Sequence, residues 1–258
     1  MPIRKDVSRA QSIYILFENH ITLALFLYRS WASYIEYSYI YGANMILVCG
    51  GSKGGSGKTT VSTNLAVLRA SEGRHVLMVD ADEQESSTIF SAIRRKEHAD
   101  KPQYTSVVLR DDRVRTEVTA LFGKFDDVII DTGGRDSRSQ RSAIAVADLL
   151  LVPFNPRSLD IWTIENNEKI VHDLLPFNPN LRIVAFLNRA DPYGSDNDAC
   201  KALLSDVEWL EFADTPLGNR KAFGKAVASG LAVTELKPQD PKASDEASAF
   251  YTYIFGME

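Results

Sequence analysis

The stretch KGGSGKTT, residues 53–60, constrains the fold of this chain more than any other feature. It follows an apolar run at residues 45–49 and precedes a segment with helical periodicity. Glycines in such a loop let backbone N–H groups converge on phosphate oxygens, and a helix that starts there adds the positive end of its dipole. A strand, a glycine-rich loop and a helix in this order therefore predict a phosphate-binding loop in an α/β fold.

The loop departs from the ordinary pattern G-x-x-x-x-G-K-[S/T] at its first position. That pattern requires a glycine five residues before Gly57, and Ser52 stands there. The remainder is intact, because Lys58 is placed to reach the β and γ phosphates and the Thr59 hydroxyl is placed to bind Mg2+. The residues alone leave open whether this is a damaged phosphate loop or a different version of one.

Short apolar runs alternate with helical patterns from residue 45 onward. Nearly continuous apolar strands are typical of a parallel sheet that helices cover on both faces. We therefore expect one domain over residues 45–258 with a three-layer α/β/α P-loop NTPase fold and a mostly parallel, twisted sheet of about seven to eight strands. The expected strands are 45–49, 75–80, 104–109, 126–131, 148–153, 182–188 and 207–212, and the expected helices are 59–70, 86–96, 113–122, 138–147, 159–174, 198–205 and 219–229.

The first 44 residues differ from the remainder because they are crowded with Tyr and Phe. Their longest apolar run, residues 21–28, is far shorter than the roughly 20 residues that cross a bilayer. We interpret residues 1–44 as a dispensable N-terminal extension or the product of a misassigned start codon. The net charge of -5 gives no global attraction to nucleic acid, and Cys49 and Cys200 lack metal-binding spacing, so a reducing cytoplasm is expected.

Two further predicted strands end in carboxylates. One leads into Asp80 and Asp82, and the other ends at Asp131, which Gly133 follows closely. A carboxylate after an apolar strand is typical of the Walker B arrangement, in which it holds Mg2+, and Gly133 can bring a backbone N–H to the γ-phosphate. A strand-end aspartate by itself is more often a turn or a helix cap, so these assignments depend on the phosphate loop.

Four segments, in this order and spacing, carry a resemblance to a known family: KGGSGKTT, VDADEQ, VIIDTGGRDS and ADLLLVPFNP. Together they are similar to the ParA/MinD family of deviant Walker A P-loop ATPases, and most of all to short plasmid-partition ParA proteins. In that family the loop has the form K-G-G-x-G-K-[S/T], so Ser52 is expected and Lys53 is the signature lysine. The likeness extends from residue 45 to about residue 255.

The resemblance implies roles for individual residues. Lys53 is expected to reach across an ATP-dependent sandwich dimer to the partner's phosphates, Asp82 to position the attacking water, and Asp80 to support the site. Glu83 departs from the family, which usually carries proline there, so the path of this loop is not carried over. The candidate residues are then, as catalytic groups, Lys53, Lys58 and Asp82; as nucleotide contacts, Lys53, Gly54, Gly55, Ser56, Gly57, Lys58, Thr59, Thr60, Gly133, Asn188 and Pro216; and as magnesium ligands, Thr59 and Asp131.

The nature of the base depends on the resemblance. The segment LNRAD, residues 187–191, resembles the guanine motif N-K-x-D with Arg189 in place of lysine. The family resemblance instead assigns Asn188 to the adenine edge and places Pro216 near the ring. ATP with Mg2+ is expected on that ground, whereas the motif alone leaves ATP and GTP undecided.

The resemblance also implies partners. ParA proteins bind DNA without sequence preference as ATP dimers, and a centromere-binding partner of the ParB/ParG kind stimulates hydrolysis. Arg189, Arg220, Lys221 and Lys225 are candidate DNA contacts, although two lysines one helical turn apart are equally typical of a solvated helix face. The basic residues at 94–96 are interpreted as favouring a helix C-terminus.

The expected function is slow, magnesium-dependent ATP hydrolysis that positions plasmid or chromosome cargo from a nucleoid-associated, cytoplasmic location. A MinD-like membrane role requires a basic amphipathic C-terminal helix, and no basic residue follows Lys242, so no membrane partner is expected. A metabolic P-loop ATP-dependent synthetase is the alternative from a different class. It would not need Lys53 at a dimer interface.

Overall fold

The computed structural model describes residues 44–158, 161–193 and 195–256, so all of the expected N-terminal extension except Asn44 lies outside the described residues. Its elements, with η for a 3-10 helix, are β1 Met45–Cys49, α2 Lys58–Ser71, β2 Val76–Asp80, α3 Ser86–Glu97, β3 Thr105–Val108, α4 Asp112–Leu121, β4 Asp127–Asp131, α5 Arg138–Ile144, β5 Leu149–Phe154, η1 Pro156–Ser158, α6 Ile161–Leu174, β6 Arg182–Ala190, α7 Asp196–Ser205, β7 Glu211–Gly218, α8 Lys221–Ala228, η2 Val233–Glu235 and α9 Pro241–Phe255.

A single parallel sheet organises the described residues. Its seven strands lie in the order β3-β2-β4-β1-β5-β6-β7, and all neighbouring strands run parallel. The register pairs Asp131 with Asp80 on one side and with Cys49 on the other, so the carboxyl ends of the neighbouring strands β2, β4 and β1 meet. The expected α/β fold is confirmed, and ligands of such sheets bind at the carboxyl edge where the strand order reverses.

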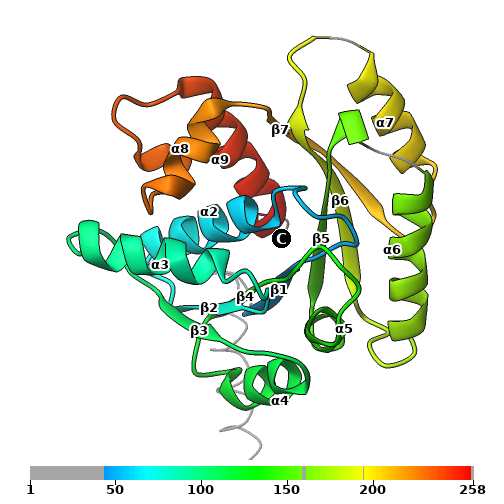
Figure 1. Ribbon diagram of the computed structural model, residues 1–258, viewed down its shortest axis with the longest axis horizontal. Helices are drawn as coiled ribbons and strands as arrows, with labels where there is room; N and C mark the ends of the chain where they lie inside the picture. The colour runs from blue at the N-terminus through cyan, green and yellow to red at the C-terminus, as the bar shows by residue number, and fades with distance from the viewer. Residues whose placement is uncertain (1–43, 159–160, 194, 257–258) are drawn as a thin grey trace, which may run out of the picture. The chain divides into compact units, whose positions relative to one another are not determined.

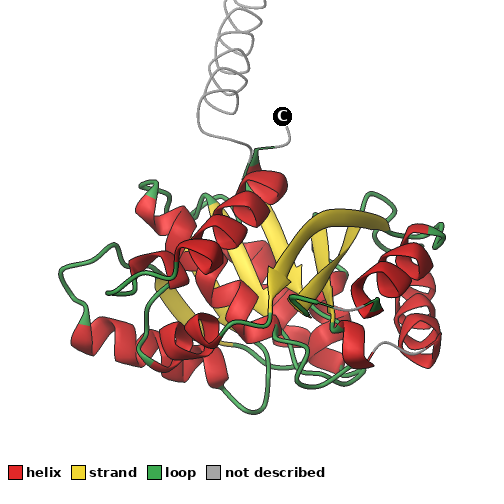
Figure 2. Cartoon of the chain, turned by 90° about the horizontal axis from the view of Figure 1, so that it is seen from above, coloured by secondary structure: helices red, strands yellow, loops and turns green. Residues whose placement is uncertain are grey.

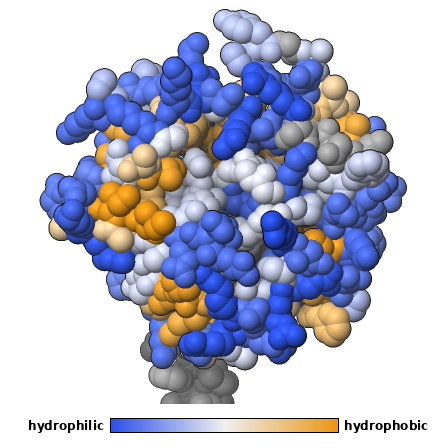
Figure 3. All heavy atoms as spheres, in the orientation of Figure 1, coloured by the Kyte–Doolittle hydropathy of each residue, from blue (hydrophilic) through white to orange (hydrophobic). Residues whose placement is uncertain are grey.

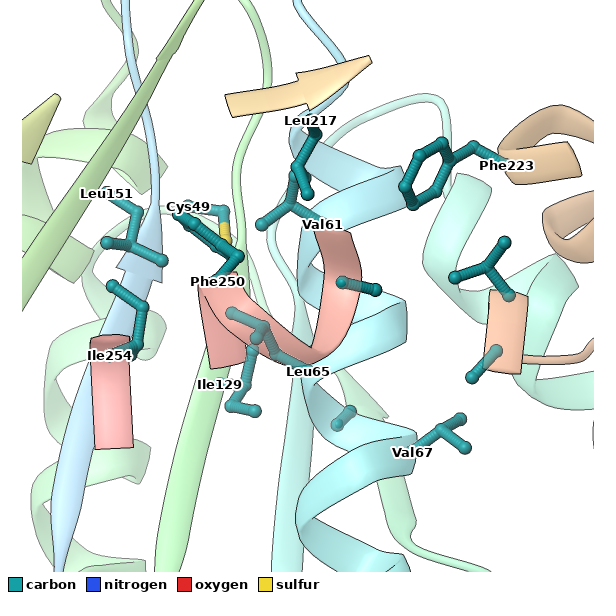
Figure 4. Packing of buried hydrophobic residues seen from close by; sticks show 14 of the residues in the cluster. Cys49, Val61, Leu65, Val67, Ile129, Leu151, Leu217, Phe223, Phe250 and Ile254 are labelled. Carbon is teal, nitrogen blue, oxygen red and sulfur yellow. The ribbon is translucent and has the colours of Figure 1, made fainter. Parts of the chain in front are cut away.

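Helices cover both faces of this sheet, as Figures 1 and 2 show. Alternate strand residues face opposite ways: Leu47 and Cys49 pack with α2, α3, α8 and α9, whereas Ile46 and Val48 pack with α4, α5, α6 and α7. Figure 4 shows Phe250 of α9 packed near Leu65 of α2 on the first of these faces. Burial on both faces explains why the strands read as continuous apolar runs.

The seventh strand and the last helix differ from expectation. The strand expected at residues 207–212 is wrongly placed, because β7 begins at Glu211 and includes Pro216. β7 is an edge strand, and proline is tolerated there because its missing N–H does not remove a hydrogen bond of the sheet. Burial of Leu217 favours the observed register. Helix α9 was not expected, although Asp240 caps it by accepting a hydrogen bond from Ala243 N at 3.1 Å. No helix among the described residues is long and apolar enough to span a membrane.

Residues 94–96 lie in the last turn of α3, as interpreted, and Arg94 has a further, structural role. Its side chain is 1% exposed and forms an ion pair with Glu235 of η2 at 2.8 Å. Two of its nitrogens also donate to the carbonyl of Pro102, at 3.1 and 2.7 Å. A buried arginine needs such partners, so Arg94 ties α3 to the segment after α8 and does not act as a solvent-exposed charge at the helix end.

Candidate active site

The glycine-rich loop joins β1 to α2 at the carboxyl edge of the sheet (Figure 1). Gly55 and Gly57 have φ angles of +73° and +94°, which favour glycine over residues with a Cβ. Gly57 is also required by packing, because an added Cβ would lie 2.1 Å from Nδ2 of Asn188. Helix α2 starts directly after it, at Lys58, so the positive end of its dipole points at the loop.

Three buried amide side chains hold this loop from different elements. Oδ1 of Asn167, on α6, accepts from Ser52 N at 2.7 Å, and Nδ2 of Asn188, on β6, donates to Ser56 O at 2.6 Å. The side-chain amide of Gln140, on α5, lies 3.3 Å from Gly51 N and 3.2 Å from Thr132 Oγ1. The backbone of the loop is thus prepared to hold a ligand with little rearrangement.

A pocket of about 1020 Å³ opens beside the loop. Figure 3 shows this face as mostly hydrophilic, with a paler centre where the loop crosses the view of Figure 1. A large polar pocket at a helix N-terminus suits a multiply charged anion. Its lining comes from the phosphate loop, the segments after β2, β3 and β4, and Arg189: Gly54, Gly55, Gly57, Lys58, Thr59, Thr60, Ala81, Asp82, Glu83, Gln84, Ser86, Arg110, Asp111, Thr132, Gly133, Gly134, Arg135, Asp136, Ser137, Ser139 and Arg189.

Lys58 and Asp131 form the charged centre below this pocket. Burial lowers the pKa of Lys58, and the nearby carboxylates of Asp131 and Asp82 oppose that change. Burial raises the pKa of Asp131 to about 7, while the Thr59 hydroxyl and Lys58 favour its charged form and Asp80 and Asp82 disfavour it. The Lys58 ammonium donates to Lys53 O at 2.8 Å, so a neutral carbonyl is its hydrogen-bond acceptor here.

The Asp131 carboxylate fits a divalent cation. Both of its oxygens are buried and have no hydrogen-bond partner of ordinary geometry in the part of the chain that the structure describes. Unsatisfied buried carboxylate oxygens are costly, and a metal ion is one ligand that removes the cost. The Asp131 carboxylate and the nearby Thr59 hydroxyl form a small oxygen ligand set that suits Mg2+, which takes few protein ligands and completes its shell with phosphates and water.

The segment after β2 places two aspartates differently. Asp80 is committed to structure, because its carboxylate accepts from Asp82 N at 3.1 Å and from Thr88 N at 2.8 Å. Asp82 lines the pocket, and its Oδ1 would lie 3.0 Å from a Cβ built on Gly133. The carboxylate of Asp82 and the backbone of Gly133 therefore lie side by side at the pocket wall.

Most of the nucleotide contacts that the sequence predicts line one pocket, but some predicted residues lie elsewhere. Lys53 stands at the start of the loop, where its carbonyl accepts from Lys58, and it does not line the pocket. Asn188 is buried, with Nδ2 on Ser56 O and Oδ1 accepting from Arg189 N at 3.0 Å, and Pro216 is exposed on the edge strand. The base contacts of Asn188 and Pro216 stay predictions.

The four candidate DNA contacts do not form one cluster of free cations. Arg189 lines the pocket with a φ of +57°, and Arg220 donates to Glu246 Oε1 at 2.9 Å. Lys221 and Lys225 are exposed on α8, one turn apart. Of the four, these two lysines are best placed for a large polyanion.

Sequence reasoning missed Gln140 and Asn167. Gln140 lies on α5 and Asn167 on α6, where Asn166 precedes it, and amides on helices are common without any functional role. Only their positions in space bring them to the loop, 89 and 115 residues away from the backbone atoms that they contact. No motif in the chain could have identified them.

Comparison with known proteins settles the family. Residues 46–233 match the family described as the CobQ/CobB/MinD/ParA nucleotide binding domain. The chain belongs to this family. The match includes the loop, Asp82, Asp131 and Asn188, and the resemblance expected from the sequence is confirmed.

Three curated relatives indicate the branch. Protein ParA of Rhizobium radiobacter is 31% identical over 224 residues, which is 81% of this chain and 96% of that protein. Protein virC1 of Rhizobium rhizogenes is 30% identical over 187 residues, which is 69% of this chain and 78% of that protein. Maintenance of carboxysome distribution protein A of Halothiobacillus neapolitanus is 28% identical over 197 residues, which is 75% of this chain and 88% of that protein.

Solved structures share the fold. An ATP complex of a Cyanothece McdA variant with a single aspartate-to-alanine substitution has a TM-score of 0.66 and 18% identity, covering 84% of this chain and 98% of that one. Cobyrinic acid a,c-diamide synthase from Mycobacterium smegmatis, with an ATP analog and magnesium, also has a TM-score of 0.66 and 18% identity. That match covers 82% of this chain and 94% of the synthase chain. Because two proteins with different names fit equally well, the fold by itself does not select between their activities.

Proposed function

We propose that this chain is a magnesium-dependent ATPase of the ParA type that positions DNA or a DNA-linked cargo. The observation that carries the proposal is the buried, unsatisfied Asp131 carboxylate beside Lys58 and Thr59, below a glycine-rich loop. The ParA relative that matches over 96% of its own length supports the partition branch.

The residues of the pocket divide the work of phosphoryl transfer. Backbone N–H groups of Gly55, Gly57 and the start of α2 bind the phosphate oxygens, and Lys58 exchanges the Lys53 carbonyl for a phosphate. Asp82, at the wall beside Gly133, accepts a hydrogen bond from the attacking water. Thr59 and Asp131 would hold magnesium, which would supply positive charge to neutralise the phosphates.

Lys53 is proposed to act across a dimer. Its place at the start of the loop, outside the pocket lining of its own chain, agrees with such a role. We expect Lys53→Ala to keep monomer nucleotide binding and to lose ATP-dependent dimerisation or hydrolysis. Sedimentation with ATP and with ADP, together with phosphate release, measures both, and a variant that still dimerises and turns over normally refutes the role.

ATP is proposed over GTP. In the guanine motif the final aspartate binds the base, and the corresponding Asp191 is engaged here by Arg157, whose Nε donates to it at 2.7 Å. A carboxylate already paired with arginine is a poor acceptor for a guanine edge. Competition of labelled ATP with excess unlabelled GTP is the test: displacement by GTP as efficient as that by ATP contradicts the assignment.

DNA binding without sequence preference is proposed for the ATP-bound dimer, with stimulation of hydrolysis by a centromere-binding protein of the ParB/ParG kind. Lys221 and Lys225, exposed on α8, are the proposed phosphate contacts. Arg220 is a weaker candidate, since Glu246 neutralises it.

The deciding experiment measures DNA binding with ATP, with ADP and without nucleotide over a salt series. Binding only with ATP, falling as salt rises, supports the ParA activity, whereas no binding favours a metabolic synthetase. Replacing both Lys221 and Lys225 by alanine removes four lysines from the dimer and is expected to lower the slope of log affinity against log salt by up to about 4. The control replaces two other exposed lysines, Lys124 between α4 and β4 and Lys169 on α6.

We also propose that residues 45–258 form the working domain and that the protein acts in the nucleoid-associated cytoplasm. Deletion of residues 2–44 is expected to leave nucleotide affinity and solubility unchanged. A truncated chain that precipitates or no longer binds ATP refutes the boundary.

A further inference from the structure

The segment between β4 and α5 forms one wall of the pocket and carries an arginine that the family resemblance does not assign. Gly133 through Ser137 all line the pocket, and Arg135 lies at the middle of this segment. The side chain of Arg135 is exposed, so its guanidinium is free to turn toward a ligand in the pocket.

The N-terminal part of this segment packs against the phosphate loop. A Cβ built on Gly134 would lie 2.4 Å from Gly54 Cα and 2.5 Å from Gly54 N, so the two backbones are in direct contact. Arg135 follows at once and therefore starts next to the loop. It lies on the side where Asp82 and Gly133 meet, which is the side of the terminal phosphate in the proposed function.

The C-terminal part is held by helix α5. Ser137 caps the helix by accepting from Gln140 N at 3.1 Å. Asp136 receives two hydrogen bonds from Arg141, at 2.6 and 2.8 Å, in a bidentate pair. With both ends fixed, residue 135 has little freedom to move its backbone away from the pocket.

The charge of Arg135 is not neutralised within the described part of the chain, where it has no ion pair or hydrogen bond. Its neighbour Asp136 is occupied by Arg141. By contrast, Arg110, another arginine of the pocket, donates to Asp80 O at 2.6 Å and pairs with Glu85 at 3.1 Å. Arg189, the third, is exposed and likewise has no side-chain ion pair or hydrogen bond among the described residues, but it follows Asn188 of β6, whereas Arg135 follows Gly134, which contacts the phosphate loop.

We propose that Arg135 contacts the terminal phosphate within its own subunit and stabilises the charge that develops there during hydrolysis. Arg135 is then a catalytic residue in cis, additional to Lys53 from the partner subunit, and this role rests on the proposed ATPase function. A guanidinium is suited to this position, because its planar fork matches the equatorial oxygens of a phosphoryl group and stays charged at all working pH values.

Arg135→Ala and Arg135→Lys test the role, with Arg138→Ala as the matched control. Arg138 is an exposed arginine three residues away, on the first turn of α5, and does not line the pocket. We expect Arg135→Ala to lower kcat by about 100-fold or more, as removal of one preorganised charge donor does, with the lysine variant intermediate. The control should hydrolyse ATP at the wild-type rate.

Binding measurements separate catalysis from folding. Calorimetry should show ADP with Mg2+ bound to Arg135→Ala within about twofold of wild type, and ADP with aluminium fluoride bound at least ~50-fold more weakly, because only the latter resembles the transition state. A loss of ADP affinity equal to the loss with aluminium fluoride overturns the catalytic role in favour of ground-state binding.

Subunit mixing distinguishes cis from trans. Arg135→Ala is mixed with Asp82→Asn, which keeps the phosphate loop and Lys58 for ATP-dependent dimerisation but lacks the carboxylate that positions the water. In the cis arrangement no activity returns, because the site with Asp82 lacks Arg135 and the site with Arg135 lacks Asp82. Recovery of hydrolysis refutes the cis assignment.

The outcomes also separate this inference from the proposed function. If the Arg135→Ala variant hydrolyses ATP as fast as an active wild type does, the inference is refuted and the proposed function is not. A wild-type chain that neither binds nor hydrolyses ATP refutes the proposed function and the inference with it.

Discussion

The buried carboxylate of Asp131 is expected to destabilise the metal-free protein at neutral and alkaline pH. Burial raises its pKa from 3.8 to about 7, so the folded state binds this proton more tightly than the unfolded state does. The stability that the proton contributes is complete below pH 4 and is lost as the pH rises toward 7 and beyond. Raising the pKa from 3.8 to about 7 corresponds to a change in the free energy of unfolding of at most about 4 kcal/mol.

Asp131→Asn removes this titration while keeping the shape of the side chain. In EDTA, the free energy of unfolding of the variant relative to wild type is expected to increase by roughly 2–3 kcal/mol between pH 5 and pH 8. The absolute gain at pH 8 is smaller than the upper limit, because Lys58 loses a nearby carboxylate in the variant. Urea unfolding at the two pH values measures the difference, and Asp245→Asn, at an exposed position on α9, is the control.

With Mg2+ and ATP present, wild type should become more stable than Asp131→Asn. Wild type gains stability from ligand binding in proportion to the logarithm of ligand concentration over its dissociation constant, and the variant, without the ligating carboxylate, gains much less. The reasoning is refuted if the difference between variant and wild type in EDTA does not change with pH, or if the variant is the less stable protein at pH 8.

Three further changes follow from the contacts of the loop and sheet. Gly134→Ala places a Cβ against Gly54 and should weaken ATP binding at least tenfold in a filter assay, whereas unchanged affinity means that the backbone contact is dispensable. Asn167→Leu leaves the Ser52 N–H buried without its acceptor and should cost about 1–3 kcal/mol in urea unfolding; a loss below 0.5 kcal/mol, roughly the error of such work, contradicts this. Asp127→Asn, at the start of β4, removes the carboxylate with which the buried Arg69 and Arg74 form ion pairs. The free energy of unfolding should fall by about 3–5 kcal/mol, measured by thermal unfolding. A variant as stable as wild type argues against a structural role for these ion pairs.

Several parts of the fold could be predicted because they depend on local pattern. The strand before the loop and the strand ending at Asp131 are continuous apolar runs, and both were expected within one residue of their observed bounds. β7 could not be predicted, because Pro216 and Asp214 disfavour a strand locally, whereas pairing with β6 and burial of Leu217 stabilise it only in the folded chain. Arg94 has the sequence context of a surface charge, and only the folded chain brings Glu235 to it.

The sequence by itself determined the chemistry of the site: a glycine-rich loop, a lysine, a hydroxyl and strand-end aspartates have one compatible ligand class, and their order along the chain indicates the family. Ser52 shows the limit of such patterns. Its residue type says only that the loop is not the ordinary one, whereas the fold shows its N–H held by Asn167 from α6. Tertiary structure alone decided which amides support the loop, which arginines are neutralised, and that Arg135 lines the pocket unpaired within the described residues and next to the phosphate loop. The physical reason is distance along the chain: glycine conformation and strand burial act between neighbours in sequence, whereas hydrogen bonds and ion pairs form between residues that only folding brings together.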